Sequence, residues 1–364
     1  MCQNLKLLTF PFFAICMALS PMVSADSLED GKAAFERHDD AAAVIAFRDA
    51  AEQGNPAAQF NLGFMYFEGL GVEKNYQEAI NWYRKAANAG YADAQLNLGI
   101  VYDKGQGAEK NDQEAVGWYT KAAEQGIAAA QNNLGIMYAE GQGVEQSDEK
   151  AVTWYVMAAE QRYALAQFNL GNAYFMGKGT DQNYSKAYVW FDLAAANGEA
   201  MAVKNRDLAA EKMSPARIAE AQFNLGFRYN HGHGVNKNLQ KAVDWYRKAA
   251  ELGDSRAQTN LGFMYTKGQG MVQDYMAAVD WYRKAAEQGY VLAQFNLGTM
   301  YARGQGVTQD FVQSYMWLDL AASQGHAAAA RNRDRVASRL SPQQINAAKR
   351  MARGNRSQNP TPEN

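Results

Sequence analysis

The chain has 364 residues, of which 48% are hydrophobic and 20% are charged, and its formal net charge is −2. This length allows a large buried core, and the near-neutral charge lacks the basic footprint typical of proteins that bind nucleic acid or anionic lipid. Both cysteines, Cys2 and Cys16, lie near the N-terminus. Once this segment is removed, disulfides, thiol nucleophiles and cysteine-ligated metals are excluded.

Residues 1–25 have the pattern of a secretory signal peptide. Lys6 precedes an apolar stretch, and the triplet Val23-Ser24-Ala25 has small residues where cleavage before Asp26 requires them. The alternative is a membrane anchor, but the stretch is short and contains two prolines. The pattern predicts an exported protein, periplasmic or alternatively secreted, with no stable membrane anchor after cleavage.

The next segment, 26–56, is expected to form an N-terminal capping pair of helices. Phe35 and Phe47 occupy core positions of this pair. Ala46 stands where each later unit has a tryptophan, and the paired glycines of those units are missing. We therefore expect this pair to close one end of a repeat array.

The seven tryptophans recur at one position of a repeat. Five of the six gaps between them are 36 residues long, and the sixth is 55. A fixed period of this length indicates a solenoid, in which each unit buries its apolar face against its neighbours. The tryptophans are Trp82, Trp118, Trp154, Trp190, Trp245, Trp281 and Trp317.

Residues 58–92 illustrate the unit, an all-α hairpin. Leu62 and Tyr66 lie on one face of a first helix, and Gly63 beside them implies that another helix packs too closely for a side chain. Two glycines end this helix and allow a sharp reversal. Asn75 then caps a second helix, whose tryptophan and alanines are expected to face the core.

One repeat lacks the glycine that ends the second helix. Arg162 stands where Gly126 and Gly198 occur in the neighbouring units. If the left-handed turn is kept, a residue with a side chain costs about 1–2 kcal/mol there. This predicts a weak joint between repeats three and four.

The array divides into two capped blocks. Residues 57–220 hold repeats one to four with an internal cap, and 221–353 hold repeats five to seven with a C-terminal cap. A change of superhelical path is expected near 200–220, and the polar segment 354–364 is expected to be a disordered tail. The caps match at an offset of 127 residues, in the segments 190–195 with 317–322, 205–207 with 332–334, and 213–215 with 340–342.

The motif Ala-Gln-x-Asn-Leu-Gly, followed by Gly-x-Gly-Val and Ala-x-x-Trp-Tyr, resembles the Sel1-like repeat family, which is related to tetratricopeptide repeats. The resemblance covers roughly residues 57–326 in seven units. It implies a right-handed α/α superhelical solenoid of about seven 36-residue repeats that acts as an adaptor or scaffold. Some relatives carry a disulfide in each repeat, and this chain departs from them because its repeats have no cysteine.

The chain offers little catalytic chemistry. His231 and His233 form the only close histidine pair, in the loop of repeat five. They are interpreted as part of a variable loop, with a weak transition-metal site as the alternative. The basic pairs 84–85 and 247–248 are interpreted as a solvated helix face. The sequence thus predicts a non-enzyme without a cofactor or a resident metal.

The candidate partner site is a stripe on the first helices. Three positions spaced i, i+4 and i+7 share one face, which by resemblance to tetratricopeptide repeats lines the concave groove. The alternative is that these rings pack between helices. The candidate residues are Phe60, Phe64, Phe67, Asp103, Phe168, Phe175, Phe223, Phe227, Asn230, Phe263 and Phe295.

These features predict an exported, non-enzymatic adaptor that binds a peptide segment or helix of a protein partner in this groove. The resemblance implies envelope signalling, polysaccharide export or cell-wall machinery as its context. A secreted factor that acts on host cells is the second hypothesis, and a hydrolase or peptidoglycan-binding enzyme is the third. Nucleic acid is not an expected partner, and the sequence favours no particular oligomeric state.

Overall fold

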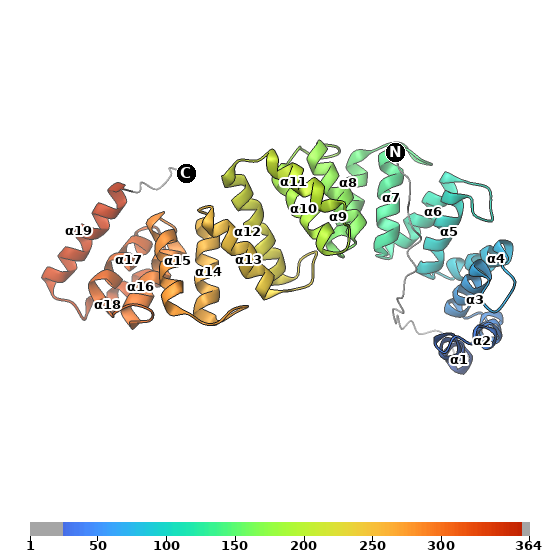
Figure 1. Ribbon diagram of the computed structural model, residues 1–364, viewed down its shortest axis with the longest axis horizontal. Coiled ribbons are helices and arrows are strands. Elements are labelled where there is room, and N and C mark those ends of the chain that lie inside the picture. The colour runs from blue at the N-terminus through green and yellow to red at the C-terminus, as the bar shows by residue number, and fades with distance from the viewer. Residues whose placement is uncertain (1–24, 359–364) are drawn as a thin grey trace. The chain divides into compact units, whose positions relative to one another are not determined.

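The computed structural model describes residues 25–358, which form nineteen α-helices and no strand (Figure 1). None of the helices in this range is long and apolar enough to cross a membrane. The chain divides into two compact units, 1–125 and 126–364. The predicted signal peptide lies outside the described residues, apart from Ala25 at the start of the first helix.

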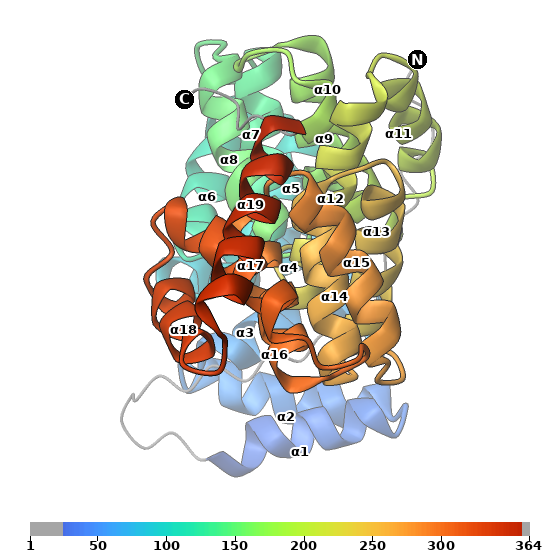
Figure 2. The same cartoon turned by 90° about the vertical axis from the view of Figure 1, so that its left-hand side faces the viewer.

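The first unit is built from three helix hairpins. The helices α1 and α2 form the N-terminal pair and lie side by side (Figure 2), and each later pair is one repeat. Phe47 and the neighbouring alanines of α2 are buried between the first two hairpins. The helices are α1 (Ala25–Glu36), α2 (Asp40–Glu52), α3 (Pro56–Glu68), α4 (Tyr76–Asn88), α5 (Ala92–Lys104) and α6 (Asp112–Glu124).

The second unit continues the all-α pattern with repeats three to seven and two capping segments. Its repeats again alternate a first and a second helix, each packed against the next. The helices are α7 (Ala128–Glu140), α8 (Asp148–Glu160), α9 (Ala164–Met176), α10 (Tyr184–Ala196), α11 (Ala202–Glu211), α12 (Pro215–His231), α13 (Leu239–Glu251), α14 (Ser255–Lys267), α15 (Tyr275–Glu287), α16 (Val291–Arg303), α17 (Phe311–Ser323), α18 (Ala327–Ala337) and α19 (Pro342–Gln358).

Local sequence signals fix the ends of the helices. Gly69 ends α3 in the left-handed conformation, with φ of 79°. Asn75 then caps α4, and its side chain accepts hydrogen bonds from the backbone amides of Gln77 and Glu78. Because these groups would otherwise lack intrahelical partners, the cap sets where the second helix begins.

The mid-helix glycines allow close contact between the two helices of a repeat. A Cβ atom on Gly63 would lie 2.8 Å from the ring of Tyr83 and 3.1 Å from the carbonyl oxygen of Ala79. Leu62 beside it is fully buried. The prediction of a closely packed second helix is confirmed, and a tyrosine ring of that helix is the group that excludes a side chain.

The tryptophans are less buried than the sequence predicted. Trp118, Trp190 and Trp317 are buried, but the other four are half-buried. A lysine three residues later lies over the ring of three of these four, as Lys85 does at 3.6 Å from the centroid of Trp82. The basic pairs on the second helices therefore cover aromatic rings, which the interpretation as a solvated face missed.

Buried glutamines connect successive repeats. Gln258 of α14 donates from Nε2 to the carbonyl oxygen of Ala250 at 3.0 Å. Its Oε1 accepts from Nε2 of Gln288, 30 residues later, at 2.8 Å. We call this pair of side chains the amide relay. It recurs for Gln95 with Gln125, Gln131 with Gln161, Gln167 with Asn197, and Gln294 with Gln324, at 2.7–2.9 Å.

Repeat five breaks the amide relay. Its buried glutamine is Gln222, whose Oε1 accepts no hydrogen bond. The residue 30 positions later is Leu252, at the C-terminal end of α13, where the five relay repeats have a side-chain amide; repeat one also lacks it, with Ala89 after Gln59. The missing donor explains the unsatisfied oxygen.

The internal and C-terminal caps share one ion-pair design. Arg206 of α11 donates to Asp192 at 2.9 Å, and Arg333 of α18 donates to Asp319 at 3.1 Å. Burial raises the pKa of Asp192, and the guanidinium of Arg206 opposes this shift. The 127-residue match read from the sequence thus corresponds to the same contact in both caps.

The internal cap leads directly into repeat five. Ser214 caps α12, and Pro215 begins a single 17-residue helix that runs to His231. This helix packs on α10 as well as on α13. The internal cap therefore packs differently from an ordinary repeat, and the change of superhelical path expected near 200–220 stays a prediction.

The loop of repeat five is held against repeats three and four. The carbonyl oxygen of Gly234 accepts hydrogen bonds from Gln167 at 2.7 Å and Asn197 at 3.1 Å. Arg162, left-handed with φ of 69°, donates to Asn236 of the same loop. The predicted left-handed turn is confirmed. The sequence predicted only that Arg162 weakens the joint between repeats three and four. The structure adds that its side chain connects repeat three to repeat five.

These contacts also bear on the division of the chain. The sequence divides the array by its caps at 220–221, and this division stays a prediction; the compact units meet at 125–126. Within the second unit, the loop that contains Gly234 and Asn236 bonds repeat five to repeats three and four. The expected disordered tail also starts too early, because α19 continues to Gln358, and 359–364 lie outside the described residues.

Candidate partner-binding face

The candidate residues lie on the first helices of the repeats, α3, α5, α9, α12, α14 and α16. In each helix they take one of three positions, which we name after their members in repeat one as position 60, position 64 and position 67. The three positions have different surroundings. The structure therefore distinguishes rings that pack against other rings of the array from rings that are exposed.

Rings at position 60 pack inside the array. The ring of Phe60 lies 5.7 Å from that of Tyr83 and 5.3 Å from that of Tyr91 at the start of the next repeat. The first of these contacts recurs for Phe223, whose ring lies 5.7 Å from that of Tyr246. Phe168 packs on Phe191 and Phe295 on His326, at 5.7 and 4.6 Å. The packing alternative is therefore the better account of this position.

Rings at position 67 also pack within their repeat. Phe67 lies 5.0 Å from Tyr76 of the second helix, and Phe175 lies 5.3 Å from Tyr184 in the equivalent place. The polar residue Asp103 instead accepts a hydrogen bond from Tyr119 at 3.4 Å and pairs with Lys104 at 3.0 Å. Asn230 is half-buried at the same position.

Position 64 carries the two most exposed rings of the candidate set. Phe227 of α12 is 41% exposed and Phe263 of α14 is 45% exposed. Phe64 differs, because it is half-buried and packs edge-on against Phe35 of the N-terminal pair at 6.4 Å. Of the nine candidate aromatic residues, the structure thus leaves Phe227 and Phe263 available to a partner.

Polar groups surround these two rings. Each repeat has an asparagine three residues before position 64, and Asn260 hydrogen-bonds the hydroxyl of Tyr246. Burial raises the pKa of Tyr246 and Tyr282 to about 12, and both side chains are almost fully buried. These asparagines form a row that the sequence analysis overlooked. A comparison of the same position in every repeat would have found it.

Repeats three and four form a cavity on the same face. A small cavity of 140 Å³ lies among α7, α8 and α9, beside Asn169 and Asn172. Ala139 and Ala173 line it where repeat one has Phe67 and Met65. The smaller side chains thus open the face where the larger ones fill it elsewhere.

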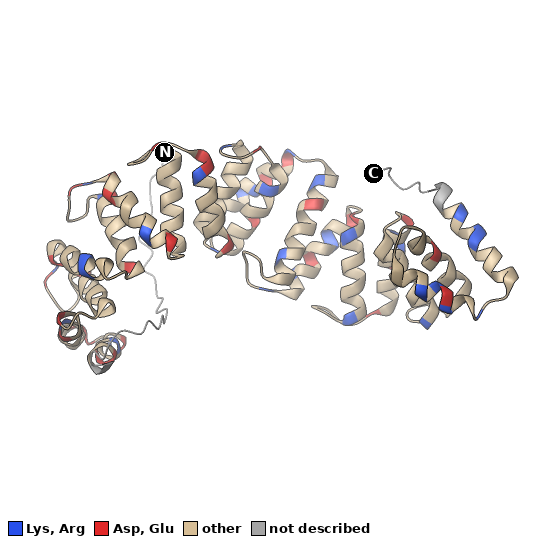
Figure 3. Cartoon of the chain, turned by 180° about the vertical axis from the view of Figure 1, so that it is seen from behind, with Lys and Arg blue, Asp and Glu red and all other residues tan. Residues whose placement is uncertain are grey.

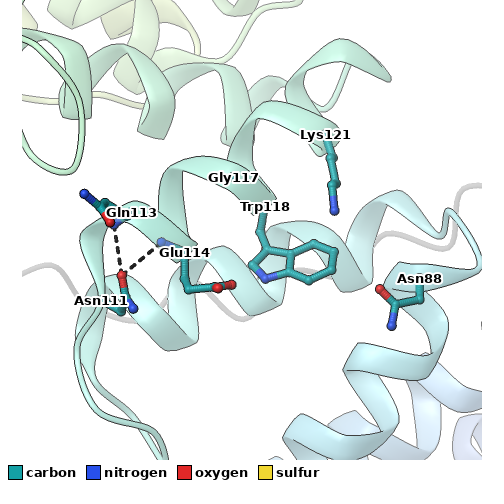
Figure 4. A pocket seen from close by; sticks show the side chains of 7 residues that line it. All are labelled: Asn88, Asn111, Gln113, Glu114, Gly117, Trp118 and Lys121. Carbon is teal, nitrogen blue, oxygen red and sulfur yellow. Dashed lines mark hydrogen bonds between the residues drawn. The ribbon is translucent and has the colours of Figure 1, made fainter.

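A larger hollow of 440 Å³ lies in the first unit, away from the candidate residues (Figure 4). Trp118 and Lys121 of α6 line it together with Asn111, whose side chain is already engaged in capping α6. Gly117 leaves one side open, since a Cβ there would meet no atom within 4 Å.

The histidine pair is next to the exposed ring of α12. His231 stacks on Phe227 at 4.1 Å, and its Nδ1 lies 2.9 Å from the carbonyl oxygen of Phe227. The ring of His233 lies 5.7 Å from that of His231. Within residues 25–358, no group of three or more His, Cys, Asp or Glu side chains could hold a metal.

The seven repeats match a known family, and together the matches cover most of the chain. The Sel1 repeat model matches residues 56–91, 92–127, 128–163, 164–199, 219–254, 255–290 and 291–326. The chain is a Sel1 repeat protein. Members of this family are generally protein-interaction scaffolds and generally not enzymes, and the resemblance drawn from the sequence is confirmed.

Solved structures of Sel1 repeat proteins are similar to this chain. A protective antigen of uropathogenic Escherichia coli with an SLR fold is 32% identical, with 87% of this chain and 79% of that chain covered and a TM-score of 0.42. A Sel1 repeat protein from Oxalobacter formigenes is also 32% identical, with 85% and 86% covered and a TM-score of 0.40.

A curated relative matches over a short segment. The chitin synthase regulator SKT5 of Saccharomyces cerevisiae is 43% identical over 47 residues. The match covers 13% of this chain and only 7% of the length of that relative.

Proposed function

We propose that this Sel1 repeat protein is an exported adaptor, periplasmic in location, that binds a segment of a protein partner along its first helices. The observation that carries the proposal is the exposure of Phe227 and Phe263 at equivalent positions of two successive repeats, 41% and 45%. Large apolar side chains exposed in register on neighbouring helices are typical of interaction surfaces.

The surroundings of these rings support a peptide as the ligand. The asparagines of successive first helices place amide donors and acceptors beside the two rings, and an extended peptide needs such groups for its backbone. A pair of rings would supply anchors for its apolar side chains. The location rests on the signal-peptide pattern of residues 1–25.

A crosslinked pull-down with paired variants tests the proposal. The tagged mature chain is compared with the double variant Phe227→Ser and Phe263→Ser in the native envelope fraction. Because both rings are exposed, we expect the partner to be lost while helicity is kept. The control is Val272→Ser with Met276→Ser, which removes two exposed apolar side chains elsewhere in the same unit.

The outcomes separate the alternatives. Loss of one reproducible protein in the phenylalanine variant, and not in the control, supports the adaptor. Retention of that protein in both variants contradicts binding at this face. Recovery of the mature chain in the culture supernatant instead of the periplasm would contradict the proposed location and favour a secreted factor.

A further inference from the structure

The exposed rings continue into a row of cations. We define the basic-aromatic row as Phe227, Phe263, Lys267, Arg303 and Arg335. Lys267 and Arg303 are the last residues of α14 and α16, and each stands four residues after position 64 of its repeat. Arg335 of α18 occupies the equivalent of position 64 itself, because it lies 36 residues after Thr299, which has that position in repeat seven. All five side chains are exposed, and α12, α14, α16 and α18 follow one another along the second unit (Figure 1).

The cations of the row are not neutralised within the described residues. Arg228 and Arg256 on the same helices pair with Glu160 and Asp254. Lys267, Arg303 and Arg335, by contrast, form no ion pair in the range 25–358. Lys267 lies 5.9 Å from the ring of Phe263, which leaves its ammonium group close to an exposed apolar surface.

The rest of the chain supplies an internal comparison. At the position of Lys267, repeats one and three have Glu68 and Glu140, and repeat two has Lys104. Lys104 already pairs with Asp103. The basic charge of this position is therefore concentrated in repeats six and seven and is not a general property of the repeat.

The C-terminal cap is also more basic than the internal cap. Residues 327–358 contain eight lysines and arginines against a single acid, Asp334, whereas the matching segment 200–231 contains five against three. Figure 3 shows this charge as blue segments on the helix next to the C-terminus. The near-neutral charge of the whole chain conceals a basic surface at this end of the second unit.

We infer that the basic-aromatic row binds an acidic segment of a protein that also carries bulky apolar side chains. The inference rests on the proposed function and names the chemistry of the partner. Charge complementarity selects an acidic ligand. The two exposed rings beside the cations can anchor the bulky apolar side chains of such a peptide.

A peptide-display selection on the full mature chain tests the inference. We expect the enriched peptides to be rich in Asp and Glu together with Leu, Phe or other large apolar residues. The strongest binder, fluorescently labelled, is then titrated against Lys267→Glu with Arg303→Glu. Because two attractions become repulsions, its Kd should rise at least about tenfold, and more at low salt than at high salt.

A matched control keeps the overall charge change the same. Lys178→Glu with Lys212→Glu reverses two exposed lysines outside the row, and its Kd should change less than about threefold. Thermal unfolding followed by circular dichroism checks that both double variants are folded. Phosphatidylglycerol vesicles serve as the competing anionic surface.

Each result is decisive. Enriched peptides without an acidic bias, equal effects of the two charge reversals, or tighter binding of vesicles than of any peptide would overturn the inference. If the Phe227→Ser and Phe263→Ser variant loses its partner while the charge reversal does not, the inference fails and the proposed function stands. If neither variant loses the partner, both fail.

Discussion

The broken amide relay in repeat five predicts that Leu252→Gln stabilises the second unit. Gln222 has a buried Oε1 without a donor, and the intact relays place a donor nitrogen 2.7–2.9 Å from the equivalent oxygen. An unsatisfied buried carbonyl costs about 1–3 kcal/mol. Leu252 is 45% exposed, so its replacement loses little apolar burial.

The expected gain is about 1 kcal/mol, the typical net value of one hydrogen bond made to a buried group. For a unit of this size the midpoint of thermal unfolding should rise by about 2–4 °C. Differential scanning calorimetry on the full mature chain measures this shift, with urea unfolding as the second method.

Leu252→Glu is the matched control, because glutamate has the size of glutamine but its ionised carboxylate cannot donate a hydrogen bond. The reverse change, Gln288→Leu, should cost about 1–3 kcal/mol by leaving Oε1 of Gln258 without a partner. If Leu252→Gln and Leu252→Glu have the same unfolding midpoint, the hydrogen bond is not the source of stability and the reasoning is refuted.

Two further predictions concern close packing and a buried charge. Gly262→Ala should cost about 1–3 kcal/mol by overpacking, because its Cβ would lie 2.8 Å from the ring of Tyr282. Gly117→Ala, with no atom within 4 Å, should instead stabilise its helix by about 0.5–1 kcal/mol, and urea unfolding compares the two. Arg206→Met should cost about 2 kcal/mol at neutral pH by leaving Asp192 ionised and unpaired. This loss of stability should shrink as the pH falls through the raised pKa of Asp192, because the neutral carboxyl no longer needs the guanidinium. A loss of stability that does not depend on pH would contradict this prediction.

The sequence predicted those features that repeat with the period. The mid-helix glycines and the Asn, Ser or Asp caps of the second helices recur at fixed offsets, and the structure places them as expected. These features depend on contacts within a repeat or between neighbours, which makes them readable from one unit. The residues of the internal and C-terminal caps were matched by sequence, but the ion pair that they form was not predicted. The contact of the Gly234 loop with repeat four was not readable, because it joins residues that are 67 and 37 positions apart in the sequence.

The candidate site could be predicted only in part. Phe60 and Phe227 lie on the same helical stripe, yet Phe60 is covered by Tyr83 and Tyr91, whereas Phe227 is 41% exposed. Spacing along one helix cannot distinguish them, because the covering residues come from the second helix and the next repeat. Lys267 was overlooked because the net charge of the chain hides its uneven distribution.

Site-specific photocrosslinking tests the central claim most directly. A photoreactive phenylalanine analogue is placed at Phe263 on the first-helix face, or at Met276, which is 68% exposed on the second helix α15. Irradiation of intact cells, followed by mass spectrometry, identifies any crosslinked protein. The adaptor account predicts a reproducible protein adduct from position 263 and none from position 276. An adduct from position 276 alone, or equal adducts from both, would contradict it.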